Sequence, residues 1–340
     1  MPRWLSCSIQ LAALLMPASL GAEGSPPRQL LNAPVLGYVL DASRGSVRPI
    51  WGIPGASTLG QPFQLGVALR RVEVSARQDY ALAVTAAGEV VAIGFAASGD
   101  TGVRQVAGAA PGADRIALSP MGRAAALYSR AGNAVQIVTG LPAAPSVTRT
   151  VDLSTLPGAL AAAAVNDEGA LLAAFSERGL ALLFLVKPDE SVQFVTPLGE
   201  PAALSFLPNG RDALVADGRE NTVYLIRDLA GAAAATLVAG EADAISRPVA
   251  VETSLEGDRA FVAGSSGTIL AVDLATGDRT ALTCRCTPTG LARLNGRAVF
   301  RLTEPSADPL WVLDADAPEP ALVFVPADAA PAAVARGAEQ

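Results

Sequence analysis

Histidine is absent from this 340-residue sequence, and lysine occurs once, at Lys187, so nearly all of the positive charge is arginine. Histidine is the commonest general base and metal ligand in proteins, and lysine is the usual amine nucleophile. The lack of histidine excludes Ser-His-Asp, Cys-His and histidine–metal sites. We therefore expect no catalytic residue, no cofactor and no metal ligand in this chain.

Long apolar runs and basic clusters are also missing. Hydrophobic residues make up 51% of the sequence, yet no uninterrupted run of about 18 follows the first twenty positions. We expect no membrane span in the mature chain. The net charge is −7 and no basic run could neutralise a phosphate backbone, which excludes nucleic acid as a partner. Aromatic residues are only 5%, too few for a stacking surface for sugars or bases.

The N-terminus has the pattern of a secretory signal peptide. Arg3 precedes a short apolar core at 11–20, and small residues follow it. We expect residues 1–22 to be removed and 23–30 to form a linker, which makes the protein secreted or periplasmic. A retained anchor helix is the alternative, and Pro17 within the short apolar core disfavours it.

Two cysteines remain after that cleavage, Cys284 and Cys286. In an oxidising compartment they could form a small disulfide loop, although the Cα spacing of such a pair in an extended strand is near the upper limit for bridging. Free thiols are the next alternative. A redox or metal role is the weakest one, because two thiolates without histidine do not complete a zinc site.

One motif recurs along the chain: an apolar strand, a tight turn that ends in glycine, and a second apolar strand. The turn glycines are Gly122, Gly169, Gly210 and Gly257. They are separated by 47, 41 and 47 residues, and apolar runs of five to seven residues stop at Gly, Pro, Asn or Asp. A period of about 40 to 50 residues with short strands predicts an all-β propeller. Each glycine is expected to close a hairpin at positive φ rather than to cradle a phosphate.

The number of blades follows from the count of units. Six complete units start near Arg71, Asp114, Leu160, Pro201, Arg247 and Thr289. Residues 35–50 precede them and match third and fourth strands without a first and second. We predict a propeller of seven blades over residues 31–326, and a disordered Ala- and Pro-rich tail at 327–340. Six blades with an added N-terminal hairpin is the alternative.

The turns also carry a family resemblance. Ser119-Pro-Met-Gly122 is similar to the Ser-Pro-Asp-Gly turn of exported YVTN/TolB-like propellers, and residues 215–226 resemble the next hairpin of such repeats. The turns that end at Gly169, Gly210 and Gly257 are partial matches. The resemblance covers about residues 70–325 and implies the propeller fold. It is weak for function, because these propellers serve as binding platforms, assembly partners and occasionally enzymes.

We therefore expect a monomeric, non-enzymatic binding or scaffold module for a protein or a small ligand. The alternative is a lactonase- or hydrolase-like propeller with carboxylates and arginines at its channel mouth, which three or more such buried side chains converging at one end would favour. Candidate arginines are Arg70, Arg71, Arg77 and Arg219. Candidate acidic clusters are Asp167-Glu168, Asp189-Glu190, Asp217 with Glu220, and Asp314 with Asp316. None of the clusters has calcium-loop spacing, and solvated turns explain them.

Overall fold

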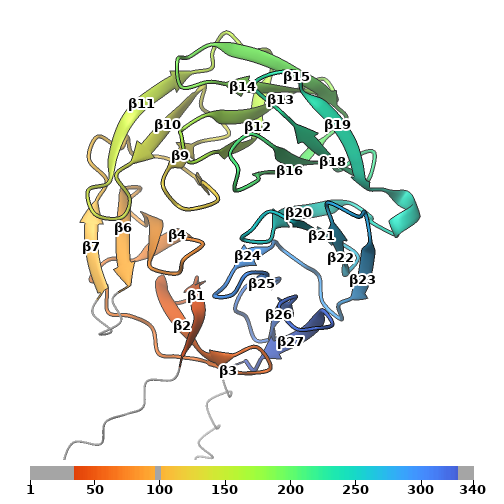
Figure 1. Ribbon diagram of the computed structural model, residues 1–340. Helices are drawn as coiled ribbons and strands as arrows, with labels where there is room; N and C mark the ends of the chain where they lie inside the picture. The colour runs from red at the N-terminus through yellow and green to blue at the C-terminus, as the bar shows by residue number, and fades with distance from the viewer. Residues whose placement is uncertain (1–33, 96–100, 328–340) are drawn as a thin grey trace, which may run out of the picture. The chain divides into compact units, whose positions relative to one another are not determined.

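The computed structural model describes residues 34–95 and 101–327, which form seven small antiparallel sheets arranged in a ring (Figure 1). This is the arrangement of a seven-bladed β-propeller. The all-β fold and the seven blades predicted from the repeats are confirmed. In these two ranges the helix content is a single short 3-10 turn, η1 (Glu241–Asp243), and no helix there could cross a membrane.

Three expected segments fall outside the described ranges. They are the signal peptide at 1–22, the linker at 23–30 and the tail at 327–340, of which the structure describes Ala327 alone.

Within each sheet, neighbouring strands are consecutive in sequence. Blades 1 to 3 contain β1 (Val35–Asp41), β2 (Ser46–Ile53) and β3 (Ala56–Leu59); β4 (Leu69–Val74), β5 (Tyr80–Thr85), β6 (Val90–Phe95) and β7 (Thr101–Gln105); β8 (Arg115–Leu118), β9 (Ala125–Tyr128), β10 (Ala134–Thr139) and β11 (Ser146–Asp152). Blades 4 and 5 contain β12 (Ala159–Val165), β13 (Leu171–Glu177), β14 (Leu180–Val186) and β15 (Val192–Leu198); β16 (Pro201–Phe206), β17 (Ala213–Asp217), β18 (Thr222–Arg227) and β19 (Ala234–Ala239). Blades 6 and 7 contain β20 (Pro248–Thr253), β21 (Arg259–Gly264), β22 (Thr268–Asp273) and β23 (Arg279–Thr283); β24 (Ala292–Arg293), β25 (Val299–Arg301), β26 (Leu310–Asp314) and β27 (Ala321–Val325).

The second strand of each complete blade is its most completely buried strand. Every residue of β5, β9 and β17 is buried, and these strands consist largely of Ala, Val and Leu. They are buried on both faces because the blades on either side pack against them, as in the clusters that join blades 2 to 3 and 4 to 5. The small alanines allow neighbouring sheets to approach. The outer strand β7 is mostly exposed, and its sequence, Thr-Gly-Val-Arg-Gln, is mostly polar.

The N-terminal unit differs from its prediction. It has three strands rather than two, and β1 is an innermost strand instead of a third strand, because its residues 38–40 line the central channel and it contacts β4. β3 lies outermost, next to β27 of the last blade (Figure 1). The turn at Ser43-Arg-Gly45 resembles the turn of the outer hairpin in other units. In this blade it joins the first two strands, β1 and β2.

The ring closes by packing between blades 1 and 7. These blades are separate sheets, and the described residues form no strand pair between them. Leu36, Val39 and Ile50 of blade 1 share one buried cluster with Leu294 and Val312 of blade 7. The closure therefore depends on side chains and on hydrogen bonds at the blade ends.

Candidate functional site: the central channel

The first strands of the blades surround a channel at the centre of the ring. β1, β4, β8, β12, β16 and β20 contact one another in succession, and β24 completes the lining. The channel holds a cavity of about 240 Å³. Propellers leave such a channel because the sheets are arranged radially, and concave sites of this kind are the usual place for a small ligand.

Four charged side chains line this cavity: Glu73, Glu252, Arg293 and Arg301. The two glutamates occupy equivalent positions in blades 2 and 6. Each lies two residues before a serine whose N–H donates across the turn, Ser75 to Tyr80 O at 2.9 Å and Ser254 to Arg259 O at 2.9 Å. The repeat therefore places both carboxylates at one level of the channel wall.

Glu252 is held from three sides. Its Oε2 accepts hydrogen bonds from Ser205 Oγ at 3.5 Å and from Arg293 Nη2 at 3.5 Å, and it also accepts from the Thr253 N–H at 3.4 Å. Arg293 is fixed in turn by bonds from its guanidinium to Thr253 O and Arg297 O, and by the Phe300 ring 5.0 Å away. The glutamate keeps 32% of its side-chain surface accessible, so it faces the open channel.

Glu73 has a similar environment. Its Oε1 lies 3.3 Å from Arg71 Nη2, and 37% of its side-chain surface is accessible. Arg301 attracts it from blade 7, while Glu304, which pairs with Arg301, repels it. Burial among the blades raises the pKa of Glu73 and outweighs the attraction of Arg71 and Arg301. Burial raises the pKa of Glu252 in the same way, against the attraction of Arg293.

Most of the candidates named from the sequence lie outside this cavity and are engaged in turns. Arg70 donates to Ala113 O, and Arg219 donates to Gly179 O. Arg77 is exposed on a turn. Of the four arginines, Arg71 is the one that contacts a channel residue.

The acidic clusters bind backbone N–H groups. Asp217 is buried, and its carboxylate accepts hydrogen bonds from four backbone N–H groups, those of Gly199, Glu200, Arg219 and Glu220. Asp167 accepts from Ser119 Oγ at 2.6 Å and from the Arg123 N–H at 3.1 Å, so it joins the turns of blades 3 and 4. Asp189 and Asp314 accept from N–H groups two residues ahead. These contacts give the clusters structural roles.

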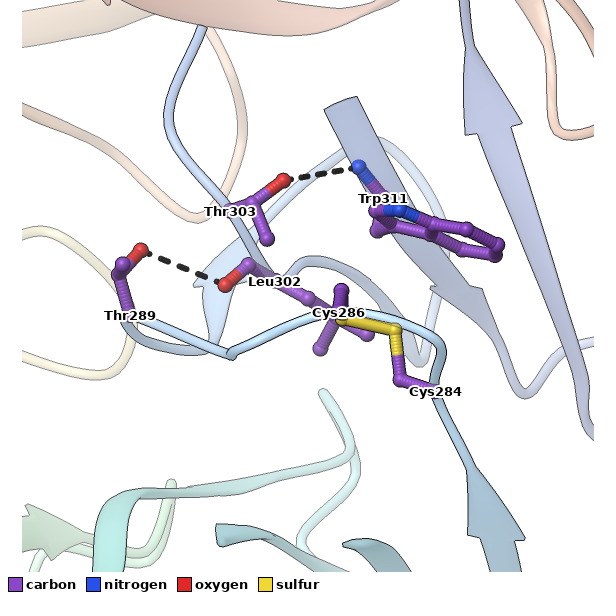
Figure 2. The surroundings of a disulfide bond; sticks show 6 residues. All are labelled: Cys284, Cys286, Thr289, Leu302, Thr303 and Trp311. Carbon is purple, nitrogen blue, oxygen red and sulfur yellow. Dashed lines mark hydrogen bonds between the residues drawn. A yellow bond between two sulfur atoms is a disulfide. The ribbon is translucent and has the colours of Figure 1, made fainter. Parts of the chain in front are cut away.

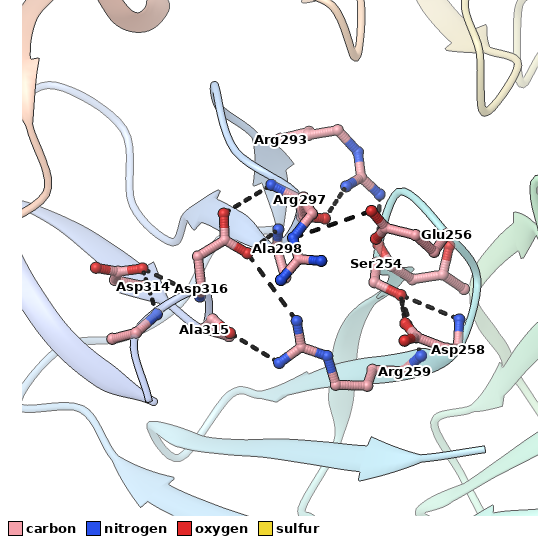
Figure 3. Close-up of polar contacts among 12 residues, drawn as sticks. Ser254, Glu256, Asp258, Arg259, Arg293, Arg297, Ala298, Asp314, Ala315 and Asp316 are labelled. Atoms are coloured by element: carbon pink, nitrogen blue, oxygen red, sulfur yellow. Dashed lines mark hydrogen bonds and ion pairs between the residues drawn. The ribbon is translucent and has the colours of Figure 1, made fainter. Parts of the chain in front are cut away.

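Asp316 belongs to a polar network between the turns of blades 6 and 7 (Figure 3). Its carboxylate accepts from the N–H groups of Arg297 and Ala298, at 2.7 and 2.8 Å, and lies 4.0 Å from Arg259. Arg259 also donates to Ala315 O at 2.7 Å, and Arg297 lies 4.0 Å from Glu256. The network ties the two blades together beside Arg293.

Cys284 and Cys286 are joined in a disulfide just after β23, with their Cα atoms 5.1 Å apart. Cys284 is buried in a cluster with Leu302, and Trp311 packs against the same cluster (Figure 2). The bridge lies between blades 6 and 7, and neither cysteine lines the channel cavity. Gly267 faces it closely, since a Cβ there would meet Cys284 O at 2.6 Å.

Sequence reasoning missed Glu73, Glu252, Arg293 and Arg301. A signal was present in the repeats, because the positions equivalent to the glutamates are alanine in blades 3 and 4 and serine in blade 5. Because a small residue suffices for the fold at this position in those blades, a charged residue there indicates a role other than packing. Neither glutamate belongs to the turn that defines the repeat, and Glu73 lies in a unit without the turn glycine.

Comparison with known proteins supports the fold. No family model and no curated protein matches the sequence. A solved protein of unknown function from Desulfotomaculum acetoxidans has a TM-score of 0.61 at 12% identity, covering 87% of this chain and 100% of its own. A Bacteroides uniformis protein provisionally assigned as a 6-phosphogluconolactonase has 0.58 at 13%, covering 86% and 96%. A catalytically inactive virginiamycin B lyase from Staphylococcus aureus, solved with quinupristin, has 0.55 at 12%, covering 78% and 86%. At these identities the likeness shows the β-propeller fold alone.

Proposed function

We propose that the protein is an exported, non-enzymatic β-propeller of the YVTN/TolB-like kind that binds a small ligand in its central channel. The observation that carries this proposal is the cavity of about 240 Å³ whose wall presents the partly accessible side chains of Glu73 and Glu252. The equivalent positions of blades 3 and 4 are alanine, so the repeat itself does not require a charged group at this level of the channel wall. The N-terminal pattern supports export.

Four carboxylate and arginine side chains do line one cavity, the arrangement expected of the hydrolase-like alternative, but they are held in ion pairs, which makes binding the better account of the site. Arg293 and Arg71 pair with the two glutamates and hold them in place. Ser119 lines the channel, but its hydroxyl is used, since it donates to Asp167 and accepts from the Ala124 N–H. Ser205 lies 3.5 Å from Glu252 Oε2, a long contact for an activated nucleophile.

Native mass spectrometry of the full chain, purified without denaturation from its own source, tests this proposal. We expect a small molecule bound at one per chain in the wild type and in Glu256→Gln, which changes an acid on a turn outside the channel. The molecule should be lost or reduced in Glu73→Gln and Glu252→Gln. A protein partner without a small molecule, or an adduct that both variants retain unchanged, would contradict the proposal.

A hydrolase-like activity is the second candidate, and the raised pKa values of Glu73 and Glu252 favour it. A carboxyl group that holds its proton to higher pH can act as a general acid. The provisional 6-phosphogluconolactonase among the structural neighbours suggests a lactone as the first substrate to try. Hydrolysis of 6-phosphogluconolactone that disappears in Glu252→Gln and persists in Glu256→Gln would establish this candidate over simple binding.

A further inference from the structure

The charged part of the channel wall carries no net charge. It is formed by three ion pairs, each of one arginine and one glutamate: Arg71–Glu73, Arg293–Glu252 and Arg301–Glu304. Two members of each sign line the cavity itself. A ligand with a single charge is therefore attracted by one half of this wall and repelled by the other half, whichever sign it has.

The free hydrogen-bonding groups of this wall also have both signs. Glu252 uses Oε2 for all three of its contacts and Glu73 uses Oε1, so Glu252 Oε1 and Glu73 Oε2 accept no hydrogen bond from the described residues. Arg301 bonds through Nη1 and Arg71 contacts Glu73 through Nη2, so Arg301 Nη2 and Arg71 Nη1 donate none to them. None of these four atoms is buried, whereas the Nε atoms of both arginines are. The wall thus offers accessible acceptors together with accessible donors.

Small side chains leave room for a ligand beside these groups. The positions equivalent to the two glutamates in blades 3, 4, 5 and 7 are Ala117, Ala164, Ser205 and Ala292, and all of them line the same cavity. The cavity volume of about 240 Å³ is just below the ~300–1,000 Å³ of sites for drug-sized ligands. A ligand that fits there is small, and it meets the acidic and the basic groups together.

We infer that the channel ligand is a small zwitterion, whose ammonium group binds Glu252 Oε1 and whose carboxylate binds Arg301 Nη2. This inference rests on the proposed function and gives the chemical class of its ligand. Both contacts are charge-assisted hydrogen bonds, which are roughly twice as strong as those of an uncharged hydroxyl compound. A zwitterion also leaves the neutral wall without net charge, which a single cation or anion does not.

Isothermal titration calorimetry of the full chain tests the inference with three matched sets of probes. The zwitterions are glycine, β-alanine and 4-aminobutyrate, which differ in the distance between their two charges. Each is compared with the amine and the carboxylate of the same carbon chain: ethylamine and acetate, propylamine and propionate, butylamine and butyrate. We expect one zwitterion to bind at least tenfold more tightly than its own amine and its own carboxylate.

Two variants test the two contacts. Glu252→Gln and Arg301→Gln should each weaken binding of that zwitterion at least tenfold. The matched controls are Glu256→Gln and Arg123→Gln, which change exposed charges that do not line the cavity and should leave the affinity unchanged. Ion pairs with a partly exposed member contribute little to stability, so both test variants should melt within roughly 5 °C of the wild type.

The outcomes separate the ligand class from the site. An amine or a carboxylate that binds as tightly as its zwitterion, or a zwitterion whose affinity both test variants retain, would overturn the inference and leave channel binding intact. If no probe binds, the small molecule found by native mass spectrometry decides: a molecule that lacks an amine or a carboxylate contradicts the inference. If no probe binds and no small molecule is found, the inference and the proposed function both fail.

Discussion

At the scale of single residues, the first hairpin shows how the chain stabilises buried charge without histidine or lysine. Asp41 and Arg48 are each 4% exposed, and their side chains lie 3.3 Å apart. Arg48 also donates to Gly60 O at 2.7 Å, while Ser43 and Arg44 donate to Asp41. Burial alone would raise the pKa of Asp41, but the hydrogen bonds from Ser43 and Arg44 and the positive charge of Arg44 outweigh it and lower the pKa to about 2.

The low pKa of Asp41 predicts an acid-dependent loss of stability. The unfolded chain binds this proton near pH 3.8 and the folded chain near 2, so the contribution is complete above about pH 4 and is lost as the pH falls toward 2. Asp41→Asn should lower the free energy of unfolding by about 2 kcal/mol at pH 7 and by much less near pH 2. Urea unfolding at both values measures this. An equal difference at the two pH values would contradict the assignment.

At the scale of the structural element, the turns do more than reverse the chain. Tyr80, at the start of β5, donates to Gly122 O of the next blade at 2.6 Å. Asn166 likewise donates to Gly210 O at 2.8 Å. Both glycines have φ of +69°, a left-handed conformation that glycine adopts without strain. The repeated turn therefore sets both the hairpin and its link to a neighbouring blade.

Replacement of a turn glycine should separate these two roles. Gly122→Ala places a Cβ 3.0 Å from Tyr80 Oη at positive φ, whereas Gly277→Ala, at φ +81°, meets nothing within 4 Å. Each variant should lose about 1 kcal/mol from backbone strain. Gly122→Ala should lose about 1 kcal/mol more, because the Tyr80 hydrogen bond is disturbed. Thermal unfolding with equal midpoints for the two variants would argue against the link between blades.

The sequence predicted elements that depend on local patterns and missed those that depend on their neighbours. Turn glycines and apolar strands located six blades, since hairpins are encoded locally. The role of β1 was not visible, because an inner and an outer hairpin have similar local sequences and differ in what they pack against. Glu73 and Glu252 could not be predicted as site residues for the same reason. Their neighbours Arg301 and Ser205 come from other blades, so their proximity exists only in the closed ring.

At the scale of the whole molecule, Gln78 spans the junction that closes the ring. It is 5% exposed and has φ of +57°. Its Oε1 accepts from the Tyr38 N–H at 3.2 Å, and its Nε2 donates to Arg293 O at 2.9 Å, across 215 positions of sequence. Asn295 adds a bond to Val35 O at 2.6 Å. One amide thus connects blades 2, 1 and 7 where no strand is shared.

Loss of this amide should weaken closure. Gln78→Ala leaves a buried N–H and a buried C=O without their partner, at a cost of about 1–3 kcal/mol, and should lower the melting midpoint by roughly 2–5 °C. Gln78→Gly relieves the positive φ but also removes the amide, so its loss should be smaller and still measurable. Gln105→Ala, which alters an exposed amide, is the control. Normal melting of both Gln78 variants would show that apolar packing alone closes the ring.

The most direct test of a ligand site in the channel is hydrogen–deuterium exchange of the full chain, with and without the small molecule retained on purification. We expect added protection in peptides from the inner strands, above all 69–74, 248–253 and 291–294, where Glu73, Glu252 and Arg293 line the cavity. Outer strands such as β15 and β19 should exchange at unchanged rates. Protection confined to those outer strands would contradict the account and place the ligand on the rim.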